Sequence, residues 1–216
     1  MIAHPLPSYL ADRFSVWKRT RFEDSRAWFA RLMEAGQHPR LMLISCCDSR
    51  VDTTAMFGSE PGDVFVVRNV ASLVPPYAVD HNHHGTSAAV EYAVTALKVA
   101  HIMVVGHSSC GGVKACHDMC SGQAPELEQD MSFIGRWMDI LRPGFERIEG
   151  RHADPKAQLR ELEHEAVRTS LRNLMSFPFV EEAVKGGQLT IHGGWIDIAE
   201  GEFHVLSSDG ERFAPV

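Results

Sequence analysis

Three short apolar runs constrain the fold of this chain most strongly. They are RLMLISC at 40–46, DVFVVR at 63–68 and HIMVVG at 101–106. None of them alternates between apolar and polar residues, which is typical of strands buried on both sides of a parallel sheet. Neighbouring parallel strands need a crossover connection, and the helical spacing of apolar residues over 85–99 supplies one. The sequence therefore predicts an α/β fold.

Helical patterns extend this plan toward both ends of the chain. An amphipathic segment over 8–37 predicts two N-terminal helices that end near Gly36. Residues 125–177 are also expected to be helical, with breaks around 143–144 and 150–155, where proline and glycine interrupt the pattern. These helices are expected to cover the sheet.

Two further strands are predicted near the C-terminus, a buried one within 188–198 and an edge strand at 202–206. The predicted architecture is a mainly parallel β-sheet of about four parallel strands plus an antiparallel edge strand, flanked by helices, with an N-terminal helical arm. We expect one domain over 1–216. Its parts are an arm at 1–37, an α/β core at 38–124, and a helical cover with the C-terminal strands at 125–216.

Composition excludes several classes of partner. The formal net charge is −7 and the sequence pI is about 5.9, so the chain lacks the basic footprint of a nucleic-acid binder. No run approaches the roughly 18 apolar residues of a membrane span, and the first residues lack a basic segment followed by an apolar one. We therefore expect a cytoplasmic protein with neither nucleic acid nor membrane as a partner.

The cysteines point to metal binding rather than to disulfides. There are five, an odd number, in two short clusters. Cysteines clustered near histidines in a reducing compartment suggest a metal site. Cys47 is expected to face the core, and Cys116 and Cys120 are expected to pack as small apolar residues or to be incidental thiols.

Two predicted strands end in candidate metal ligands. The first is followed by CCDSR and the third by HSSCGG. Because the carboxyl ends of parallel strands meet at one edge of the sheet, Cys46, His107 and Cys110 can converge on one point. Three protein ligands with an open fourth position are typical of catalytic zinc, and thiolates with imidazole favour zinc over magnesium or calcium.

These residues also resemble a known family. Cys46 to Arg50 and His107 to Cys110 are similar to the C-x-D-S-R and H-x-x-C signatures of β-class carbonic anhydrases, and the resemblance is nearly continuous over 37–115. The plant-like subclass fits better than the bicarbonate-regulated one. The regulated subclass has a tryptophan three residues before its first cysteine ligand, where this chain has Leu43. We therefore expect no regulatory bicarbonate pocket.

The resemblance implies a mechanism and a set of site residues. It implies one zinc ion per chain, whose bound hydroxide attacks carbon dioxide to give bicarbonate and a proton. Asp48 would accept a hydrogen bond from the zinc-bound water, and Arg50 would keep Asp48 ionised and oriented. The residues expected to bind or surround the substrate are Gln37, Phe65, Val70, Tyr92 and Gly111. The family also implies a homodimer, or a larger even-numbered homo-oligomer, with the N-terminal helices embracing the partner.

Several alternatives stay open at this point. Relatives of the family fold hydrolyse carbon disulfide or carbonyl sulfide at the same kind of zinc site. A serine α/β-hydrolase could use Ser108 at a strand-to-helix turn, although the G-x-S-x-G spacing fails by one residue. A zinc-stabilised or bicarbonate-sensing protein without activity would be expected to lack Asp48, Arg50 or Gln37. His81, His83 and His84 could form a proton relay or a second metal site, but a solvated loop is the favoured interpretation.

Overall fold

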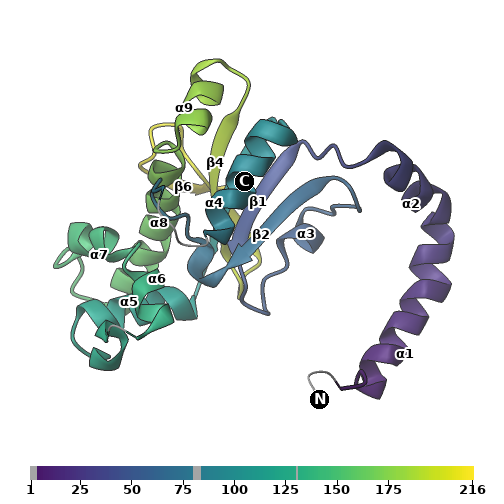
Figure 1. The fold of residues 1–216 in the computed structure, drawn as a ribbon. Helices are drawn as coiled ribbons and strands as arrows, with labels where there is room; N and C mark the ends of the chain where they lie inside the picture. Colours follow the sequence, from purple (N-terminus) through teal and green to yellow (C-terminus); the bar gives the residue numbers. More distant parts are fainter. Residues whose placement is uncertain (1–3, 80–83, 130) are drawn as a thin grey trace. The chain divides into compact units, whose positions relative to one another are not determined.

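The computed structural model describes residues 4–79, 84–129 and 131–216, and Figure 1 shows the fold. The chain divides into two compact units, Met1–His38 and Pro39–Val216. None of the described helices combines the length and the apolar character needed to cross a bilayer.

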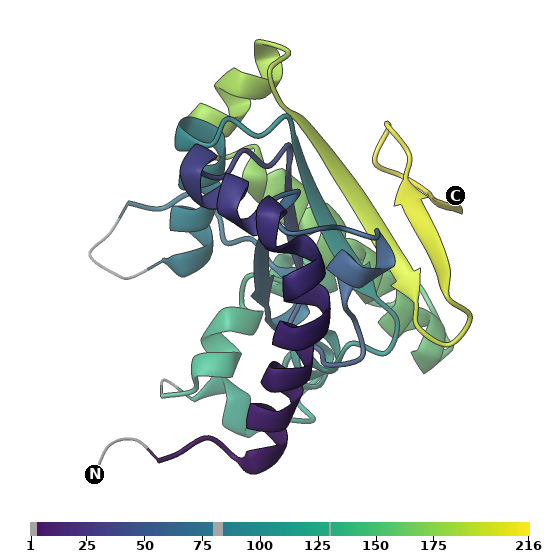
Figure 2. The ribbon, with the colours of Figure 1, turned by 90° about the vertical axis from the view of Figure 1, so that its right-hand side faces the viewer.

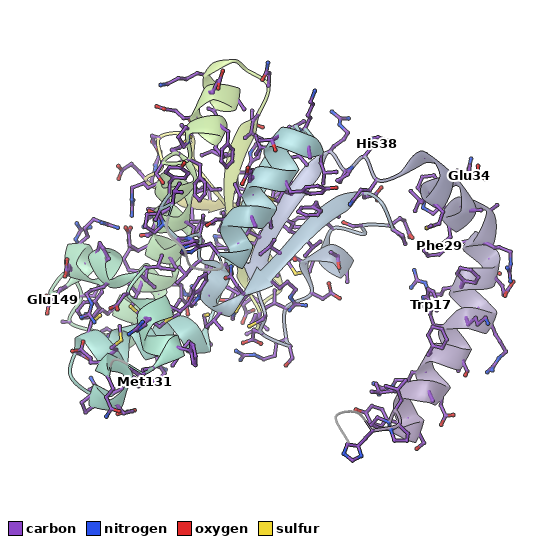
Figure 3. The ribbon with its side chains drawn as sticks, in the orientation of Figure 1. Trp17, Phe29, Glu34, His38, Met131 and Glu149 are labelled. Atoms are coloured by element: carbon purple, nitrogen blue, oxygen red, sulfur yellow. The ribbon has the colours of Figure 1, made fainter. Side chains whose placement is uncertain are left out.

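The N-terminal unit is a run of helix. Helix α1 (Ser8–Trp17), the π-helical turn η1 (Lys18–Phe22) and helix α2 (Glu23–Ala35) follow one another directly, so the two predicted helices are joined without a break. The run ends at Gly36, whose φ of 77° lies in the left-handed region that glycine adopts at little cost. Trp17 and Phe29 project from one side of this unit, with ring centroids 6.1 Å apart (Figure 3).

The second unit is built on a six-stranded sheet in the order β2-β1-β3-β4-β5-β6. Its strands are β1 (Leu41–Cys46), β2 (Val64–Asn69), β3 (His101–His107), β4 (Thr190–Asp197), β5 (Glu202–Leu206) and β6 (Phe213–Pro215). The four strands from β2 to β4 are parallel to one another, which confirms the predicted parallel sheet. β5 runs antiparallel beside β4 (Figure 2), and β6 adds a further antiparallel edge strand that was not predicted. β6 is only three residues long, too short to give a periodic signal.

Helices connect the strands and cover the sheet. They are α3 (Thr53–Met56), α4 (Gly85–Glu91) with the π-helical turn η3 (Tyr92–Ala96), α5 (Gly111–Cys120), α6 (Phe133–Met138), α7 (Arg142–Ile148), α8 (Pro155–Leu174) and α9 (Pro178–Lys185), with short 3-10 turns η2 (Val70–Ser72) and η4 (Pro125–Glu128). The break predicted around 143–144 lies a few residues earlier, at 139–141 between α6 and α7. Pro143 lies in the first turn of α7, where its missing N–H removes no helical hydrogen bond.

Helix α8 organises the core. It starts at Pro155, after the N-cap Asp154, whose carboxylate accepts hydrogen bonds from two backbone amides of the first turn. It packs against β3 and β4 and also against α5 and α7. Leu162 on α8 belongs to a buried cluster around Cys46 and Cys110, while Leu174 belongs to a second cluster around β1 and β3. The long helix therefore joins the apolar core to the region of the predicted metal ligands.

The order of the strands defines where a ligand can bind. The chain passes from β1 to β2 on one side of β1, and then to β3 on the other side. Such a reversal opens a crevice outside the carboxyl ends of the two strands that flank it, here β1 and β3. Cys46 ends β1 and His107 ends β3, so the fold brings both predicted ligands to this crevice.

Candidate metal centre

Cys46, His107 and Cys110 meet at the carboxyl edge of the sheet. Their side-chain donor atoms all lie within 4.8 Å of one another, and the two Sγ atoms are 4.0 Å apart. All three residues are buried, with exposed fractions of 4%, 1% and 4%. Cys110 comes from the turn between β3 and α5, so three separate elements supply the set.

The imidazole of His107 is oriented as a metal ligand. Its Nδ1 lies 2.9 Å from the backbone oxygen of Ser108, and in the tautomer that donates this hydrogen bond Nε2 carries the free lone pair. Nε2 is buried and makes no hydrogen bond to any residue that the structure describes. A buried nitrogen without a partner is costly, and coordination to a cation would satisfy it.

The two thiols also fit a divalent cation. Tetrahedral zinc with bonds of about 2.3 Å to each sulfur separates the two sulfurs by about 3.8 Å, close to the separation seen here. The Cys110 thiol lowers the pKa of Cys46 by hydrogen bonding to its sulfur, and the same contact, together with burial, raises the pKa of Cys110. The second proton is therefore hard to lose without a nearby positive charge. A dication would stabilise both thiolates at once.

Asp48 and Arg50 form a tightly held pair beside these ligands. Arg50 donates from Nε to Oδ1 at 3.0 Å and from Nη2 to Oδ2 at 2.7 Å, and its backbone amide donates to Oδ1 at 2.9 Å. These bonds hold the pKa of Asp48 well below its usual range, so the carboxylate is ionised. Oδ2 lies 4.0 Å from Nε2 of His107, which places a negative oxygen at the ligand cluster.

Arg68 holds the loop that carries this pair, and its role was not predicted. It lies on β2 and donates to three backbone oxygens of the neighbouring loop. The bonds reach Cys46 at 2.9 Å, Asp48 at 2.8 Å and Val51 at 2.6 Å. A single guanidinium, with its five fixed donors, thus ties the end of β1 to the chain that follows it. An arginine near the end of the strand that pairs with β1 was the only available hint.

Ser108 serves the fold rather than catalysis. Its hydroxyl oxygen accepts a hydrogen bond from the backbone amide of Ile198 at 2.9 Å and lies 3.4 Å from Oδ1 of Asp197. The described hydrogen bond of His107 goes to the backbone oxygen of Ser108 and not to its hydroxyl. A serine nucleophile needs a base on its hydroxyl, so the hydrolase alternative is not supported.

Comparisons with known proteins agree with this geometry. The carbonic anhydrase family model matches residues 41–203. In Arabidopsis thaliana, beta carbonic anhydrase 3 is 35% identical over 198 residues, covering 91% of this chain and 75% of the relative. The chloroplastic beta carbonic anhydrase 5 of that plant is also 35% identical, over 93% of this chain and 64% of the relative. This chain belongs to the β-carbonic anhydrases.

Solved β-carbonic anhydrases share the fold. The structure of the β-carbonic anhydrase CcaA superposes with a TM-score of 0.86 at 30% identity, covering 97% of this chain and 91% of the other. One of two tetrameric β-carbonic anhydrases from Sordaria macrospora gives a TM-score of 0.75 at 29% identity, covering 93% of this chain and 96% of the other. The zinc that β-carbonic anhydrases use suits the two sulfurs and one nitrogen found here.

The residues predicted to surround the substrate are only partly gathered. Phe65 packs against Tyr92 with ring centroids 5.9 Å apart, and it pairs in register with Met42, four residues before the end of β1. Val70 lies in η2, and Gly111 begins α5 directly after the ligand Cys110. Their roles as substrate contacts remain predictions.

Other predictions lie beyond the metal centre. Gln37 belongs to the N-terminal unit, so its contact with substrate also stays a prediction. His81 and His83 lie outside the described residues, whereas His84 directly precedes α4.

The remaining cysteines do not join the metal centre. Cys116 is fully buried in the cluster below the site and Cys120 packs partly against it, as predicted. The prediction that Cys47 faces the core was wrong, because β1 ends at Cys46 and Cys47 lies beyond it with an exposed side chain. Strand alternation therefore does not apply to Cys47.

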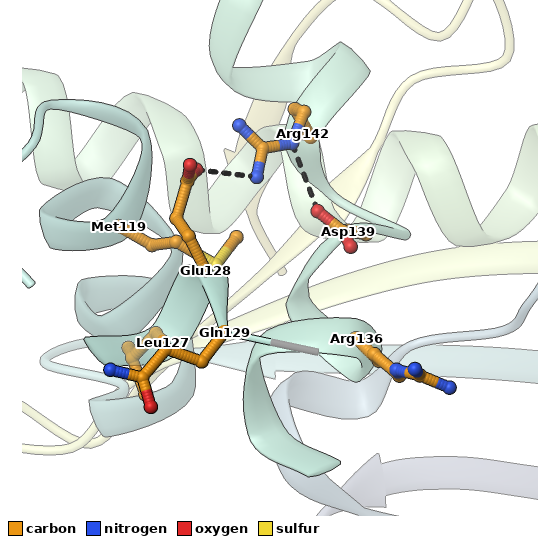
Figure 4. Close-up of a pocket in the computed structure, with 7 residues that line it drawn as sticks. All are labelled: Met119, Leu127, Glu128, Gln129, Arg136, Asp139 and Arg142. Carbon is orange, nitrogen blue, oxygen red and sulfur yellow. Dashed lines mark hydrogen bonds and ion pairs between the residues drawn. The ribbon is translucent and has the colours of Figure 1, made fainter. Parts of the chain in front are cut away.

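A separate hollow of about 180 Å³ lies among α5, η4, α6 and α7 (Figure 4). It is lined by Met119, Leu127, Glu128, Gln129, Arg136, Asp139 and Arg142. Within it Arg142 bonds to Glu128 at 2.8 Å and to Asp139 at 2.9 Å. These pairs neutralise the guanidinium, so the hollow offers a weaker case for an active site than the buried ligand cluster does.

Proposed function

We propose that this β-carbonic anhydrase catalyses the reversible hydration of carbon dioxide to bicarbonate and a proton. The observation that carries the proposal is the buried cluster of Cys46, His107 and Cys110, with the ionised Asp48 beside it. When bound, zinc supplies a Lewis acid that makes water a nucleophile near neutral pH.

Asp48 and Arg50 are proposed to orient the reaction. Oδ2 of Asp48 is positioned to accept a hydrogen bond from the attacking water, which fixes the direction of its lone pair. Arg50 keeps Asp48 charged and in place through two side-chain bonds and one backbone bond. The guanidinium also donates to the backbone oxygen of Ser109 at 3.0 Å, which links the pair to the turn that carries Cys110.

A metal analysis coupled to a carbon dioxide hydration assay tests the proposal. We expect the purified protein to hold close to one zinc per chain, to lose hydration activity with a zinc chelator, and to regain it when zinc is restored. Activity that survives complete removal of the metal would overturn the assignment.

Two cysteine variants sharpen the test. Cys110→Ser is expected to lose zinc and activity together, because a hydroxyl is a poor replacement for a thiolate. Cys116→Ser is the matched control, since Cys116 is equally buried and near the site but its thiol donates to the backbone oxygen of Met138 at 3.7 Å. Equal zinc loss in both variants would contradict the assigned ligand set.

The same centre could act on another small electrophile, so substrate choice needs its own measurement. We expect carbon dioxide hydration to exceed sulfide release from carbon disulfide or carbonyl sulfide.

Regulation by bicarbonate is not expected, because Leu43, which replaces the tryptophan of the regulated subclass, is fully buried in the sheet. A sigmoidal dependence of activity on bicarbonate would contradict this.

The chain is further proposed to act as a homodimer or a larger even-numbered homo-oligomer. Helices α1 and α2 bury none of their residues within the chain, and aromatic side chains along them stay exposed, so a second copy has an apolar face to cover. The Sordaria macrospora relatives are described as tetrameric. Sedimentation equilibrium that gives a monomer would refute this proposal.

A cytoplasmic location is also proposed. Thiolate ligands are best preserved in a reducing compartment, and the net charge of −7 suits neither a nucleic acid nor an anionic membrane surface. Fractionation of cells that express the tagged protein tests the location. Recovery in the membrane fraction would contradict it.

A further inference from the structure

A buried carboxylate lies behind the metal centre and has no part in the mechanism described so far. Glu163 lies on α8 and is 5% exposed. Its Oε1 accepts a hydrogen bond from the backbone amide of Cys110 at 3.3 Å. The side chain of Glu163 is therefore bonded to the turn that carries the ligand Cys110.

The second oxygen of Glu163 fixes the carboxylate itself. Oε2 accepts a hydrogen bond from the indole Nε1 of Trp195 at 3.3 Å and lies 3.7 Å from Nε of Arg160. Trp195 is 1% exposed, so the indole that donates this bond is buried in the core. A carboxylate that accepts bonds at both oxygens can hold one orientation.

The turn needs such support because it is strained and lies outside the helix. Ser109 has a φ of 56°, a left-handed conformation that is uncommon for a residue with a side chain. The amide of Cys110 immediately precedes α5, where backbone amides have no partner within the helix. Arg50 holds the carbonyl of Ser109 from the opposite direction at 3.0 Å. Glu163 therefore holds the turn through the backbone amide of Cys110, and Arg50 holds it through the backbone carbonyl of Ser109.

We propose that Glu163 is a positioning residue for the zinc ligand Cys110: its carboxylate holds the turn at 109–110 in the conformation that directs Sγ of Cys110 toward Cys46 and His107. The inference rests on the zinc site of the proposed function. It assigns Glu163 no contact with substrate and no proton transfer. Residues that orient metal ligands typically change metal affinity by about 10- to 100-fold when they are replaced.

The test compares Glu163 with a second buried acid on the same helix. Glu165 is also 5% exposed, but it pairs with Arg147 and Arg172, away from the metal centre. In Glu163→Gln the side-chain NH2 group replaces an oxygen that accepts hydrogen bonds, so it would face two other donors, the indole of Trp195 and the guanidinium of Arg160. Glu163→Asp keeps the charge but withdraws the carboxylate by about one bond length, and it serves if the amide variant fails to fold. Glu165→Gln is the matched control.

Two readouts other than turnover are measured on the full-length protein. In both Glu163 variants, zinc release to a chromogenic chelator is expected to be about tenfold faster or more. The sulfur-to-cobalt charge-transfer bands of the cobalt-substituted protein should also shift. Glu165→Gln should keep the wild-type release rate and spectrum, even if it unfolds at a lower temperature.

The outcomes separate the two proposals. Wild-type release and spectra in a folded Glu163 variant, or equal changes in Glu165→Gln, would overturn the positioning role while leaving the proposed function intact. Failure of the wild-type protein to bind zinc or cobalt would instead refute the metal centre, and with it both proposals.

Discussion

A Cβ atom on Gly112 would lie 2.5 Å from Cγ1 of Val70. The same atom would lie 3.1 Å from Cβ of Ala71, which belongs to the same buried cluster as Cys46. The first turn of α5 therefore touches the chain that supports a metal ligand, and only glycine allows this close approach.

Gly112→Ala is expected to destabilise the protein by about 1–3 kcal/mol, the usual cost of overpacking, and to speed zinc release by displacing Ala71. Urea unfolding and chelator kinetics measure the two effects. The control is Gly111→Ala, because a Cβ there meets nothing within 4 Å. If both variants unfold at the same urea concentration as the wild type, the close packing of α5 on η2 is not important for stability.

Arg50→Lys tests whether the geometry of the pair with Asp48, rather than its charge alone, supports turnover. A lysine ammonium cannot reproduce the forked contact to both carboxylate oxygens and the added bond to Ser109. We expect turnover to fall about tenfold or more while zinc content stays near one per chain. Arg142→Lys, in the hollow of Figure 4, replaces another arginine that contacts two carboxylates and should leave turnover unchanged. Loss of zinc from Arg50→Lys would show that Arg50 has a structural role.

The ligand set could be predicted from the sequence because it depends on a general property of parallel sheets. Cys46 and His107 each follow an apolar run, and strands of that kind end at the same edge of the sheet. Neither the exact register of β1 and β3 nor the conformation of the turn at 108–110 was needed for this prediction.

The supporting residues could not be predicted in the same way. Glu163 is 53 residues from Cys110 along the chain, and Arg68 is 22 residues from Cys46. Both act on backbone groups, which are identical in every residue and so leave no motif. The strand β6 was missed for a simpler reason, since three residues are too few to show any periodicity.

Ser108→Ala separates the structural role of this serine from a nucleophilic one. The variant loses the bond from the Ile198 amide to the hydroxyl, so we expect about 1 kcal/mol less stability with carbon dioxide hydration retained. Ser170→Ala is the control, because that buried hydroxyl also accepts a backbone amide bond, from Val74 at 3.1 Å, away from the ligands. An inactive Ser108→Ala protein that still holds its zinc would reopen the question of a serine nucleophile.

His164 should make the protein sensitive to acid. Burial, helped by the charges of Arg168 and Arg160, lowers the pKa of His164 to about 3, and its ring stacks on Phe213 with centroids 4.3 Å apart. In the unfolded chain the pKa is about 6.5, so below that pH the unfolded state binds a proton that the folded state does not. The free energy of unfolding should therefore fall by about 2 kcal/mol from this group between about pH 7 and pH 5.

His164→Phe keeps a buried aromatic ring but removes the titration, so its stability should fall less than that of the wild type as the pH is lowered. Urea unfolding of the zinc-loaded proteins between pH 7 and pH 5 measures how the free energy of unfolding depends on pH. At its steepest point, the slope for the wild type should exceed that for His164→Phe by close to one proton per chain. His152→Phe provides the control, because His152 is exposed in the connection before α8. A fall in the free energy of unfolding that came only from metal release or from the carboxylates would be the same in all three proteins. Parallel curves of stability against pH for the wild type and His164→Phe would therefore contradict the role of this buried imidazole.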